Sequence, residues 1–442
     1  MSGTNGFEPG VPNDRSSSLG WEPKIIAFVC NWCTYLGADL AGTSRLEYPS
    51  NIRILRLPCT GRIDFNLLVK AFEMKADAIL VSGCHPGDCH YNAGNYHARR
   101  RWTLFRDLLD LLGFDMRRIH FSWISAAEGK KFAQIVNEIT DKTRELGPYN
   151  VYQGKKVPYP TFPESMMPLG DFSTEPELRA TARRLLSEGK VQVVIGWGAR
   201  GPVFVTKPED ADKLVWNKDC LTNLAAYLKR KEITVLGKAA IVVKGCDERS
   251  LQVLQQESQI ERENLYVIGM ACEGLGVPKC AGCQVRQPRF ADEVIGEAKP
   301  AEEIDHYAAL DVLMAMQPEE RMGFWAEQFD RCVRCYACRQ VCPNCYCEQC
   351  IVDKNRPQEI PQSPTREGNF AWQIARAFHQ VGRCVGCGEC TRACPAGIDL
   401  WALNLVLERS AEKDFGYKAG MDGAAEPLIG SFSLKDQAEF IR

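Results

Sequence analysis

Cysteine is the residue whose number and spacing point to chemistry in this chain. The sequence of 442 residues contains 21 cysteines, far more than the packing of a hydrophobic core requires. The stretch RCVRCYACRQVCPNCYCEQC, residues 331–350, holds seven of them. Many thiols in a small secreted protein form disulfides, whereas many thiols in a large chain of a reducing compartment bind metal. The composition therefore predicts a metal-binding protein.

Two copies of the pattern C-x2-C-x2-C-x3-C-P occur in the C-terminal part of the chain, beginning at Cys332 and at Cys384. This spacing is typical of bacterial two-cluster ferredoxins, in which three thiolates of one copy and the fourth thiolate of the other bind each 4Fe-4S cluster. The predicted ligand sets are Cys332, Cys335, Cys338 and Cys394 for one cluster, and Cys384, Cys387, Cys390 and Cys342 for the other. Zinc ribbons, the alternative, use two pairs of ligands rather than three plus one.

Eight further thiols lie outside these two motifs and outside the N-terminal region. They are Cys345, Cys347 and Cys350, directly after the first motif, and Cys220, Cys246, Cys272, Cys280 and Cys283 in the middle of the chain. A C-x-C-x2-C run after a cluster ligand favours metal binding, but it needs a fourth ligand from elsewhere. Eight thiols would suffice for two more 4Fe-4S clusters, although the count does not assign ligands. Each of the middle cysteines could also be a small buried hydrophobic residue.

Five N-terminal cysteines lie at or just beyond the ends of predicted strands. Cys30, Cys59 and Cys84 end strands, and Cys33 and Cys89 follow in the loops. Because the carboxyl ends of parallel strands share one edge of a sheet, we expect these five thiols to meet there. His85 and His90 flank two of them, so a mixed Cys/His site is an alternative, as are a structural zinc site and a redox dithiol.

The elements that must position these thiols follow from the alternation of apolar runs and helical patterns. Between residues 24 and 147, the predicted strands are 24–32, 52–59, 78–84 and 119–125, and the predicted helices are 64–75, 95–113 and 129–147. A second region, 174–300, has predicted strands at 191–196, 238–245 and 264–269 and predicted helices at 176–189, 223–231 and 250–260. This pattern is typical of α/β folds with a parallel sheet covered by helices.

The remaining segments connect or flank these regions. We predict a disordered tail at 1–23, a linker at 148–173, a helical bridge at 301–330, an α-helical two-cluster ferredoxin module at 331–410 and a C-terminal tail at 411–442. The sequence GWGARG, Gly196–Gly201, matches a dinucleotide-binding fingerprint. Pro202 and β-branched residues follow where a helix should begin, so a tight glycine turn is predicted instead.

Charge and hydropathy exclude several classes of partner. The net charge of −2 gives no reason to expect binding to nucleic acid or to anionic lipid. The longest apolar runs are too short to span a membrane. The N-terminus has neither the basic nor the apolar segment of a signal peptide. We therefore expect a cytoplasmic protein.

The motifs CNWC, PCTGR and GCHPGDCHYNAGNYHARRR resemble the delta subunit of methyl-viologen-reducing hydrogenase. Members of that family are flavodoxin-like proteins with one 2Fe-2S cluster, and they deliver electrons to the flavoprotein subunit of heterodisulfide reductase. The resemblance covers about 24–146. It implies a flavodoxin-like domain and a 2Fe-2S cluster whose four ligands lie among the five N-terminal cysteines, without specifying which four.

The rest of the chain is similar to the beta-subunit family of deazaflavin-coenzyme-dependent hydrogenases and formate dehydrogenases. The motifs KGCDERSL, IGMACEG and CAGCQVRQPRFADEVIGE carry this similarity, although the ferredoxin module here follows the α/β domain, whereas the better-known members place it first. Members of that family bind FAD and a 4Fe-4S cluster. FAD is thus implied by the resemblance alone, because no comparably firm flavin signature is present in the sequence.

These features predict an electron-transfer subunit that contributes no catalytic residue. It would relay electrons from a donor hydrogenase, formate dehydrogenase or other dehydrogenase to a flavoprotein of the heterodisulfide reductase type, in a complex that the family associates with electron bifurcation. The alternative is an FAD-containing subunit that itself oxidises or reduces a deazaflavin or nicotinamide cofactor.

Three successive arginines, Arg99, Arg100 and Arg101, lie on the predicted helix just beyond Cys89. Such a run is typical of a solvated helix face, and beside a cluster loop it could steer an acidic partner. We predict that electrons leave the chain at the N-terminal domain, which docks on the flavoprotein and is called the exit terminal below. The ferredoxin module would lie inside the chain on the donor side of the electron path.

Overall fold

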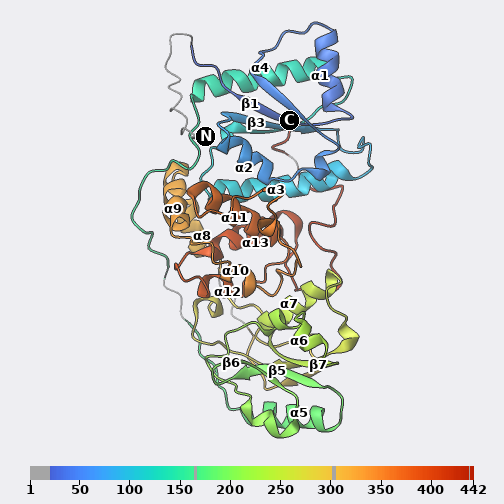
Figure 1. Cartoon of the computed structure of the whole chain (residues 1–442), viewed down its shortest axis with the longest axis vertical. Coiled ribbons are helices and arrows are strands. Elements are labelled where there is room, and N and C mark those ends of the chain that lie inside the picture. Colours follow the sequence, from blue (N-terminus) through green and yellow to red (C-terminus); the bar gives the residue numbers. More distant parts are fainter. Residues whose placement is uncertain (1–19, 164–166, 301–304, 438) are drawn as a thin grey trace, which may run out of the picture.

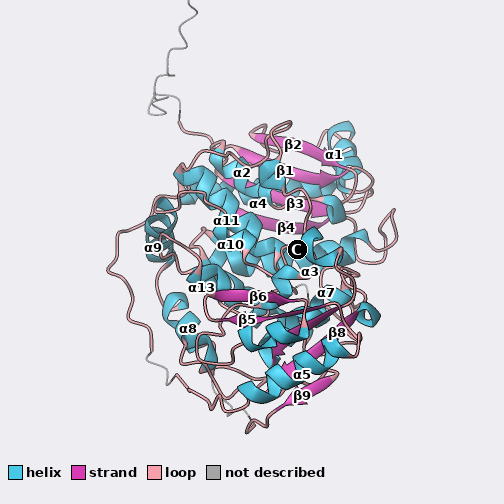
Figure 2. Ribbon diagram, turned by 60° about the horizontal axis from the view of Figure 1, so that its bottom comes forward, coloured by secondary structure: helices cyan, strands magenta, loops and turns pink. Residues whose placement is uncertain are grey.

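A computed structural model describes residues 20–163, 167–300, 305–437 and 439–442. Two β-sheets lie at opposite ends of the molecule, and the helices of the C-terminal third lie between them (Figures 1 and 2). Most of the tail predicted at residues 1–23 falls outside the described residues. The helical region between Ala308 and Phe415 therefore occupies the centre of the fold.

The first sheet is parallel and has the strand order β2-β1-β3-β4. Its strands are β1 (Ile25–Cys30), β2 (Ile52–Leu57), β3 (Ala78–Gly83) and β4 (Ile119–Trp123). This is the order with which flavodoxin-like sheets begin. Every residue of β3 is buried, as expected for a central strand with helices on both faces. The four predicted strands and the fold class of this region are confirmed.

Alternate strand residues face two helical layers. Helices α1 (Thr34–Thr43) and α4 (Gly129–Leu146) cover one face, and α2 (Asn66–Glu73) and α3 (Gly94–Leu111) cover the other. Ala27 packs towards α1 and α4, whereas Phe28 packs towards α2 and α3. The predicted helices are confirmed within a few residues, but α1 was not predicted, because its apolar residues follow no clear helical period.

The second sheet has the order β6-β5-β7-β8-β9. Its strands are β5 (Val193–Gly198), β6 (Gly201–Val205), β7 (Ala239–Lys244), β8 (Leu265–Met270) and β9 (Glu293–Ile295). Only the β5–β6 pair is antiparallel, and its register pairs Gly198 with Gly201. The sequence GWGARG therefore forms a β-hairpin turn, and the predicted tight glycine turn is confirmed.

The helices of this second region are α5 (Glu175–Ser187), α6 (Lys231–Thr234) and α7 (Gly245–Gln256). The predicted helix at 223–231 is wrong, since that segment forms a short 3-10 turn, Leu224–Tyr227, followed by α6. The Asn223 side chain accepts a hydrogen bond from the Ala225 amide, and such local bonds compete with an α-helix. Further 3-10 turns are Thr60–Arg62, Met116–Arg118, Pro208–Lys213, Arg262–Asn264, Pro278–Cys280 and Ile351–Asp353.

The central helical region shares a hydrophobic core with the first sheet. It comprises α8 (Ala308–Met314), α9 (Pro318–Asp330), α10 (Ala337–Gln340), α11 (Arg366–His379), α12 (Glu389–Arg392) and α13 (Leu400–Phe415). One continuous cluster joins Trp102 of α3 to Trp325, Phe370 and Leu403 of this region. Since apolar burial stabilises by about 25 cal/mol per Å², the two parts support each other.

The C-terminal segment returns to the first sheet. The amide of Trp123 donates to the Arg442 carbonyl at 2.8 Å, and the Arg442 amide donates to the Phe121 carbonyl at 3.1 Å. Arg100 pairs with Asp436 at 2.9 Å, and Arg99 donates to the Ser433 carbonyl at 2.6 Å.

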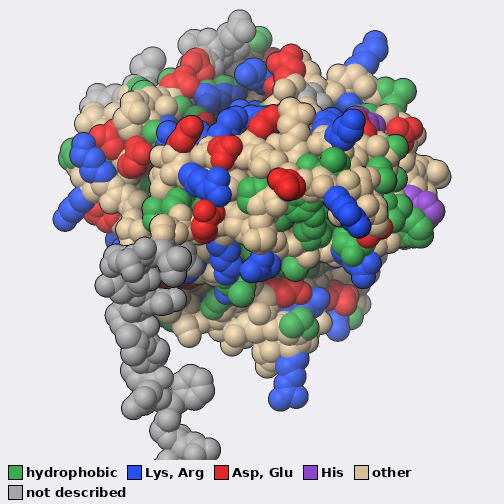
Figure 3. All heavy atoms as spheres, turned by 90° about the horizontal axis from the view of Figure 1, so that it is seen from above, with side chains coloured by type: hydrophobic (Ala, Val, Ile, Leu, Met, Phe, Trp, Pro, Cys, Tyr) green, Lys and Arg blue, Asp and Glu red, His purple; other side chains and the backbone are tan. Residues whose placement is uncertain are grey.

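The arginine run is therefore not a solvated face or a steering surface. Arg99 and Arg100 are only 5% and 7% exposed, and Arg101 donates to the carbonyls of Gly61 and Ile63. The prediction for these three residues is wrong, because their guanidinium groups hold the C-terminal segment and the loop that follows Cys59. The outer face of this end of the molecule mixes Lys and Arg with Asp and Glu (Figure 3). No helix among the described residues has the length and apolar character to cross a membrane.

Candidate iron–sulfur sites

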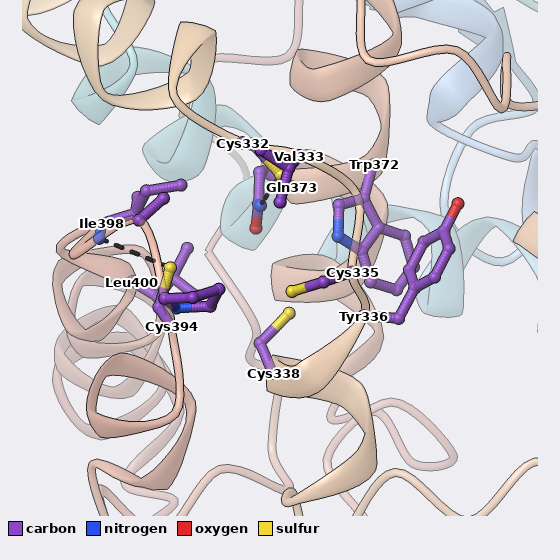
Figure 4. A pocket seen from close by; sticks show the side chains of 12 residues that line it. Cys332, Val333, Cys335, Tyr336, Cys338, Trp372, Gln373, Cys394, Ile398 and Leu400 are labelled. Atoms are coloured by element: carbon purple, nitrogen blue, oxygen red, sulfur yellow. Dashed lines mark hydrogen bonds between the residues drawn. The ribbon is translucent and has the colours of Figure 1, made fainter.

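Four cysteines of the ferredoxin module line one cavity, and they are the crossed set predicted from the spacing. Cys332, Cys335, Cys338 and Cys394 face the same space, which Tyr336, Trp372 and Leu400 help to enclose (Figure 4). The Gln373 amide donates to Cys332 Sγ at 3.6 Å, and the Ile398 backbone amide donates to Cys394 Sγ at 3.5 Å. Donors aimed at sulfur stabilise thiolates and tune a cluster. We refer to these four cysteines as set I.

The other crossed set, Cys342, Cys384, Cys387 and Cys390, is also brought together, and we call it set II. Burial raises the pKa of Cys342, and the neighbouring thiols Cys387 and Cys384 raise it further. The Cys342 thiol donates to Gln380 Oε1 at 3.5 Å. Thiols this close and this buried require a positive counter-charge to ionise, which iron supplies. Both sets therefore fit 4Fe-4S clusters in the chemistry of their donors.

Cys345, Cys347 and Cys350 lie together in the loop after Cys342. Burial raises the pKa of Cys345 to about 11, and its neighbours Cys350 and Cys347 act in the same direction. Arg339, which pairs with Asp353 at 2.9 Å, lies beside Cys350. The fourth ligand predicted for this trio is not identified by these contacts. No group of three or more His, Cys, Asp or Glu side chains within the described residues is arranged to hold a single metal ion.

The five cysteines of the middle region divide into four and one. Cys246, at the start of α7, and Cys272, after β8, are close to Cys280 and Cys283, and burial raises the pKa of Cys246, Cys272 and Cys283. Cys220 has other contacts: its Sγ accepts from the Asn217 amide at 3.3 Å and donates to the Val215 carbonyl at 3.5 Å. Buried Lys244 donates to the Cys220 carbonyl at 2.8 Å. Electrostatic contacts thus connect four of the five thiols directly, while Cys220 meets them through Lys244.

Lys279 connects this middle group to set II. Its ammonium is buried and has no hydrogen-bond partner among the described residues. The charged groups around it include Cys246 of the middle group, Asp247 and Cys387 of set II. Thiols of the middle group and of set II therefore both lie near one buried cation.

The N-terminal thiols meet at the carboxyl edge of the first sheet. The Sγ atoms of Cys30 and Cys84 are 3.7 Å apart, as are those of Cys59 and Cys89. Hydrogen bonds from Cys33 and Cys84 lower the pKa of Cys30 to about 2, and burial raises that of Cys59 to about 11. One low and several high pKa values are expected where thiols crowd in the absence of a compensating cation.

The neighbouring histidines point to other partners. His85 Nε2 lies 2.6 Å from Glu128. The carboxyl group of Glu128 has its pKa held at about 2, because the Ser125 amide and His85 outweigh the effect of burial. The His90 ring stacks on Trp32 at 3.8 Å between ring centroids. These contacts favour an all-thiolate site over the mixed Cys/His alternative.

Sequence reasoning missed the glycines that surround the N-terminal thiols. A Cβ atom on Gly94 would collide with Cys59 Sγ and lie 3.2 Å from Cys89 Sγ, and a Cβ on Gly61 would lie 2.6 Å from the Gly94 carbonyl oxygen. Glycine lets the backbone approach a bound group closely. The signal was present in PCTGR and in GDCHYNAGN, where a glycine follows each cysteine within a few residues.

Comparisons with known proteins place two parts of the chain. Residues 25–147 match the family described as methyl-viologen-reducing hydrogenase, delta subunit, and residues 328–398 match a 4Fe-4S dicluster domain. An iron-sulfur subunit of an F420-non-reducing hydrogenase from Methanococcus voltae is 53% identical over 128 residues, which is 29% of this chain and 89% of that protein. Its counterpart from Archaeoglobus profundus is 46% identical over 129 residues, 94% of that protein.

A longer relative contains the same domain. It is one of the subunits of the ferredoxin/F420H2-dependent CoB-CoM heterodisulfide reductase of Methanosarcina acetivorans, and it is 42% identical over 126 residues, which is 28% of this chain and 16% of that protein. The dicluster match supports 4Fe-4S clusters in the C-terminal module. These matches leave residues 148–327 uncovered, so the resemblance of that region to the beta-subunit family stays a prediction.

Proposed function

Through residues 25–147 the chain belongs to the family of the delta subunit of methyl-viologen-reducing hydrogenase, and from this premise we propose that it is an iron–sulfur electron-transfer subunit. It would relay electrons between a donor hydrogenase, formate dehydrogenase or other dehydrogenase and a flavoprotein of the heterodisulfide reductase type. The observation that carries this proposal is the central place of the ferredoxin module, with a thiol group on each side of it. When bound, the clusters supply one-electron transfer.

Each thiol group has residues suited to a cluster. Sets I and II would hold two 4Fe-4S clusters, the N-terminal edge a 2Fe-2S cluster with four of its five thiols, and the middle group Cys246, Cys272, Cys280 and Cys283 a further 4Fe-4S cluster. Electron tunnelling falls steeply with distance, so a relay needs closely spaced centres. Lys279 lies near thiols of both the middle group and set II, and Phe65 packs edge-on against Phe378 of α11 at 5.3 Å. These contacts support a route from one sheet to the other through the module.

The N-terminal edge is the proposed exit terminal. Trp32 and Tyr91 are 39% and 52% exposed and lie in the loops that carry Cys33 and Cys89. An exposed aromatic pair beside a cluster is suited to contact with a partner protein. Truncation of the chain before Gly147 would also remove α2 and α3 from the core that they share with α11 and α13. Docking is therefore better tested with point substitutions in the full chain.

Metal and flavin analysis of anaerobically purified protein tests the function. We expect about ten iron atoms per chain from two 4Fe-4S clusters and one 2Fe-2S cluster, and about eighteen if the middle group and a site at Cys345, Cys347 and Cys350 are also filled. Fewer than about eight iron atoms, or stoichiometric zinc, would contradict the proposal. Stoichiometric FAD released by acid would instead favour a subunit that reacts with a deazaflavin or nicotinamide cofactor itself.

Two substitutions separate the N-terminal site from the rest. Gly94→Ala places a methyl group against Cys59 and should remove the 2Fe-2S signal from electron paramagnetic resonance (EPR) spectra while the 4Fe-4S signals persist. Gly42→Ala, where a Cβ meets nothing within 4 Å, is the matched control and should change neither. A 2Fe-2S signal that persists in Gly94→Ala would place the 2Fe-2S cluster elsewhere.

Docking is tested with the full chain. Trp32→Ala should weaken binding to a heterodisulfide-reductase-type flavoprotein at least tenfold, which is about 1.4 kcal/mol. Val235→Ala, at a site that is 79% exposed on the opposite end of the molecule, should leave binding unchanged. Equal affinities of the two variants would place the terminal at another surface.

A further inference from the structure

One face of α11 is polar, buried and turned towards both ferredoxin sets. Gln373, Arg376 and Gln380 follow one another at the spacing of a single helix face, and they are only 1%, 4% and 4% exposed. Gln373 contacts Cys332 of set I, and Gln380 contacts Cys342 of set II. The helix that joins the two motifs in sequence therefore also bridges the two sets in space.

Arg376 is the charged member of this face, and thiols of both sets lie near it. Its Nε donates to Gln373 Oε1 at 3.2 Å, and its Nη2 is buried without a hydrogen-bond partner among the described residues. The charged groups that act on it most strongly are thiols of both sets, namely Cys390, Cys338, Cys342 and Cys384. A buried cation costs several kcal/mol unless negative charge surrounds it. Here thiolate ligands are the negative charge.

We propose that Arg376 raises the reduction potentials of both ferredoxin clusters together. A cluster becomes more negative when it accepts an electron, and a nearby cation in a region of low dielectric stabilises that state. Because one guanidinium faces both sets, it makes both clusters easier to reduce while it changes the difference between their potentials little. Electrons can then pass between the two clusters without either of them acting as a trap.

Redox titration of the full chain, followed by EPR under anaerobic conditions, tests this inference, which rests on the proposed 4Fe-4S assignment of sets I and II. In Arg376→Gln the equilibrium constant for one-electron reduction should fall at least tenfold at both clusters, which corresponds to a shift of at least about 59 mV to lower potential. Arg376→Lys keeps the charge, so its potentials should stay close to those of the wild-type protein. A purely structural role would not respond to charge in this way.

The matched control is Arg366→Gln on the same helix. Arg366 is exposed and pairs with Asp330, so solvent screens its charge, and neither potential should move. The inference would be overturned if Arg376→Gln kept both clusters and both reduction potentials stayed unchanged. It would also be overturned if only one cluster's potential shifted, or if the potentials of Arg376→Lys were as low as those of Arg376→Gln. The wild-type spectra test the underlying assignment separately, because two interacting 4Fe-4S signals are required there.

If Arg376→Gln loses its iron, a second variant tests the inference. Gln373→Glu keeps the shape of the side chain and places a carboxylate next to the Arg376 Nε. The carboxylate offsets the positive charge of the guanidinium without moving it. Both potentials should again fall. A shift at set I alone, the set that Gln373 touches, would show that the guanidinium does not act on set II and would overturn the inference.

Discussion

The two cluster loops of the ferredoxin module have the same backbone shape but different residues at its strained positions. In the first loop, Arg334 and Tyr336 adopt left-handed conformations, with φ values of 58° and 59°. In the second loop the equivalent positions are Gly386 and Gly388, with φ values of 67° and 71°. A residue with a Cβ pays about 1–2 kcal/mol in this region, whereas glycine does not.

The contacts of the first loop explain why side chains are kept there. Arg334 is 6% exposed and donates to the carbonyls of Gly368 and Pro361. The Tyr336 ring packs edge-on against Trp372 of α11 at 5.1 Å. These interactions fasten the loop to the start of α11 and offset its backbone strain.

The second loop is crowded from outside. A Cβ on Gly388 would lie 3.1 Å from Arg392 Nη1 and 4.0 Å from Lys279 Cδ, and Lys279 belongs to the middle region. The same arrangement of thiols is thus held by side-chain anchors in one loop and by the close approach of neighbours in the other. The lesson is that the spacing of the cysteines sets the loop shape, while the surroundings decide which residues can fill it.

The largest effect on the two loops is expected when one cysteine ligand is replaced. Cys394→Ala should remove the cluster of Cys332, Cys335 and Cys338, and so about four iron atoms per chain, while the second cluster remains. Cys342→Ala should do the reverse. EPR and iron analysis of the two variants provide the measurement. Loss of the cluster adjacent in sequence to the substituted cysteine would contradict the crossed arrangement.

Removal of the first loop's anchor gives the next largest effect. Arg334→Ala leaves the carbonyls of Gly368 and Pro361, one buried and one partly buried, without their charged donor. Hydrogen bonds to charged groups are worth about 1.5–3 kcal/mol each. We expect a decrease of roughly 2–4 kcal/mol in the free energy of unfolding, measured by anaerobic denaturant titration, with earlier loss of cluster absorbance. Arg331→Ala, at an exposed position next to the loop, should change stability by less than about 0.5 kcal/mol.

The sequence predicted what depends on short-range spacing. The crossed sets I and II followed from two motifs, and the meeting of Cys30, Cys59 and Cys84 followed from strand ends, because parallel topology places such ends on one edge. Both of these inferences rest on local patterns combined with a general rule of topology. The four parallel strands of the first sheet were predictable for the same reason.

Long-range contacts were not predictable. The burial of Arg100 depends on Asp436, which lies far away in sequence, so a local view reads the arginine run as exposed. The role of Arg376 becomes visible only once α11 is seen to lie against both sets.

Addition of one methyl group to the second loop tests the role of crowding. Gly388→Ala should cost about 1–2 kcal/mol through its left-handed backbone, and the contact with Arg392 adds to that cost. The midpoint of denaturant unfolding provides the measurement, and set II should lose its cluster first. Gly42→Ala, in open space at the end of α1, should be neutral or slightly stabilising. Equal effects at both glycines would mean that the loop relaxes around the added group.

The smallest expected effect comes from the phenol of the first loop. Tyr336 Oη accepts hydrogen bonds of 3.3 Å from Nε and Nη2 of Arg334. Tyr336→Phe removes this acceptor but keeps the ring against Trp372, so we expect a loss of about 1 kcal/mol in stability. The set I cluster should become more sensitive to denaturant while the set II signal stays unchanged. If both clusters respond equally, the anchors of the first loop stabilise the whole module, and the two loops are not held independently.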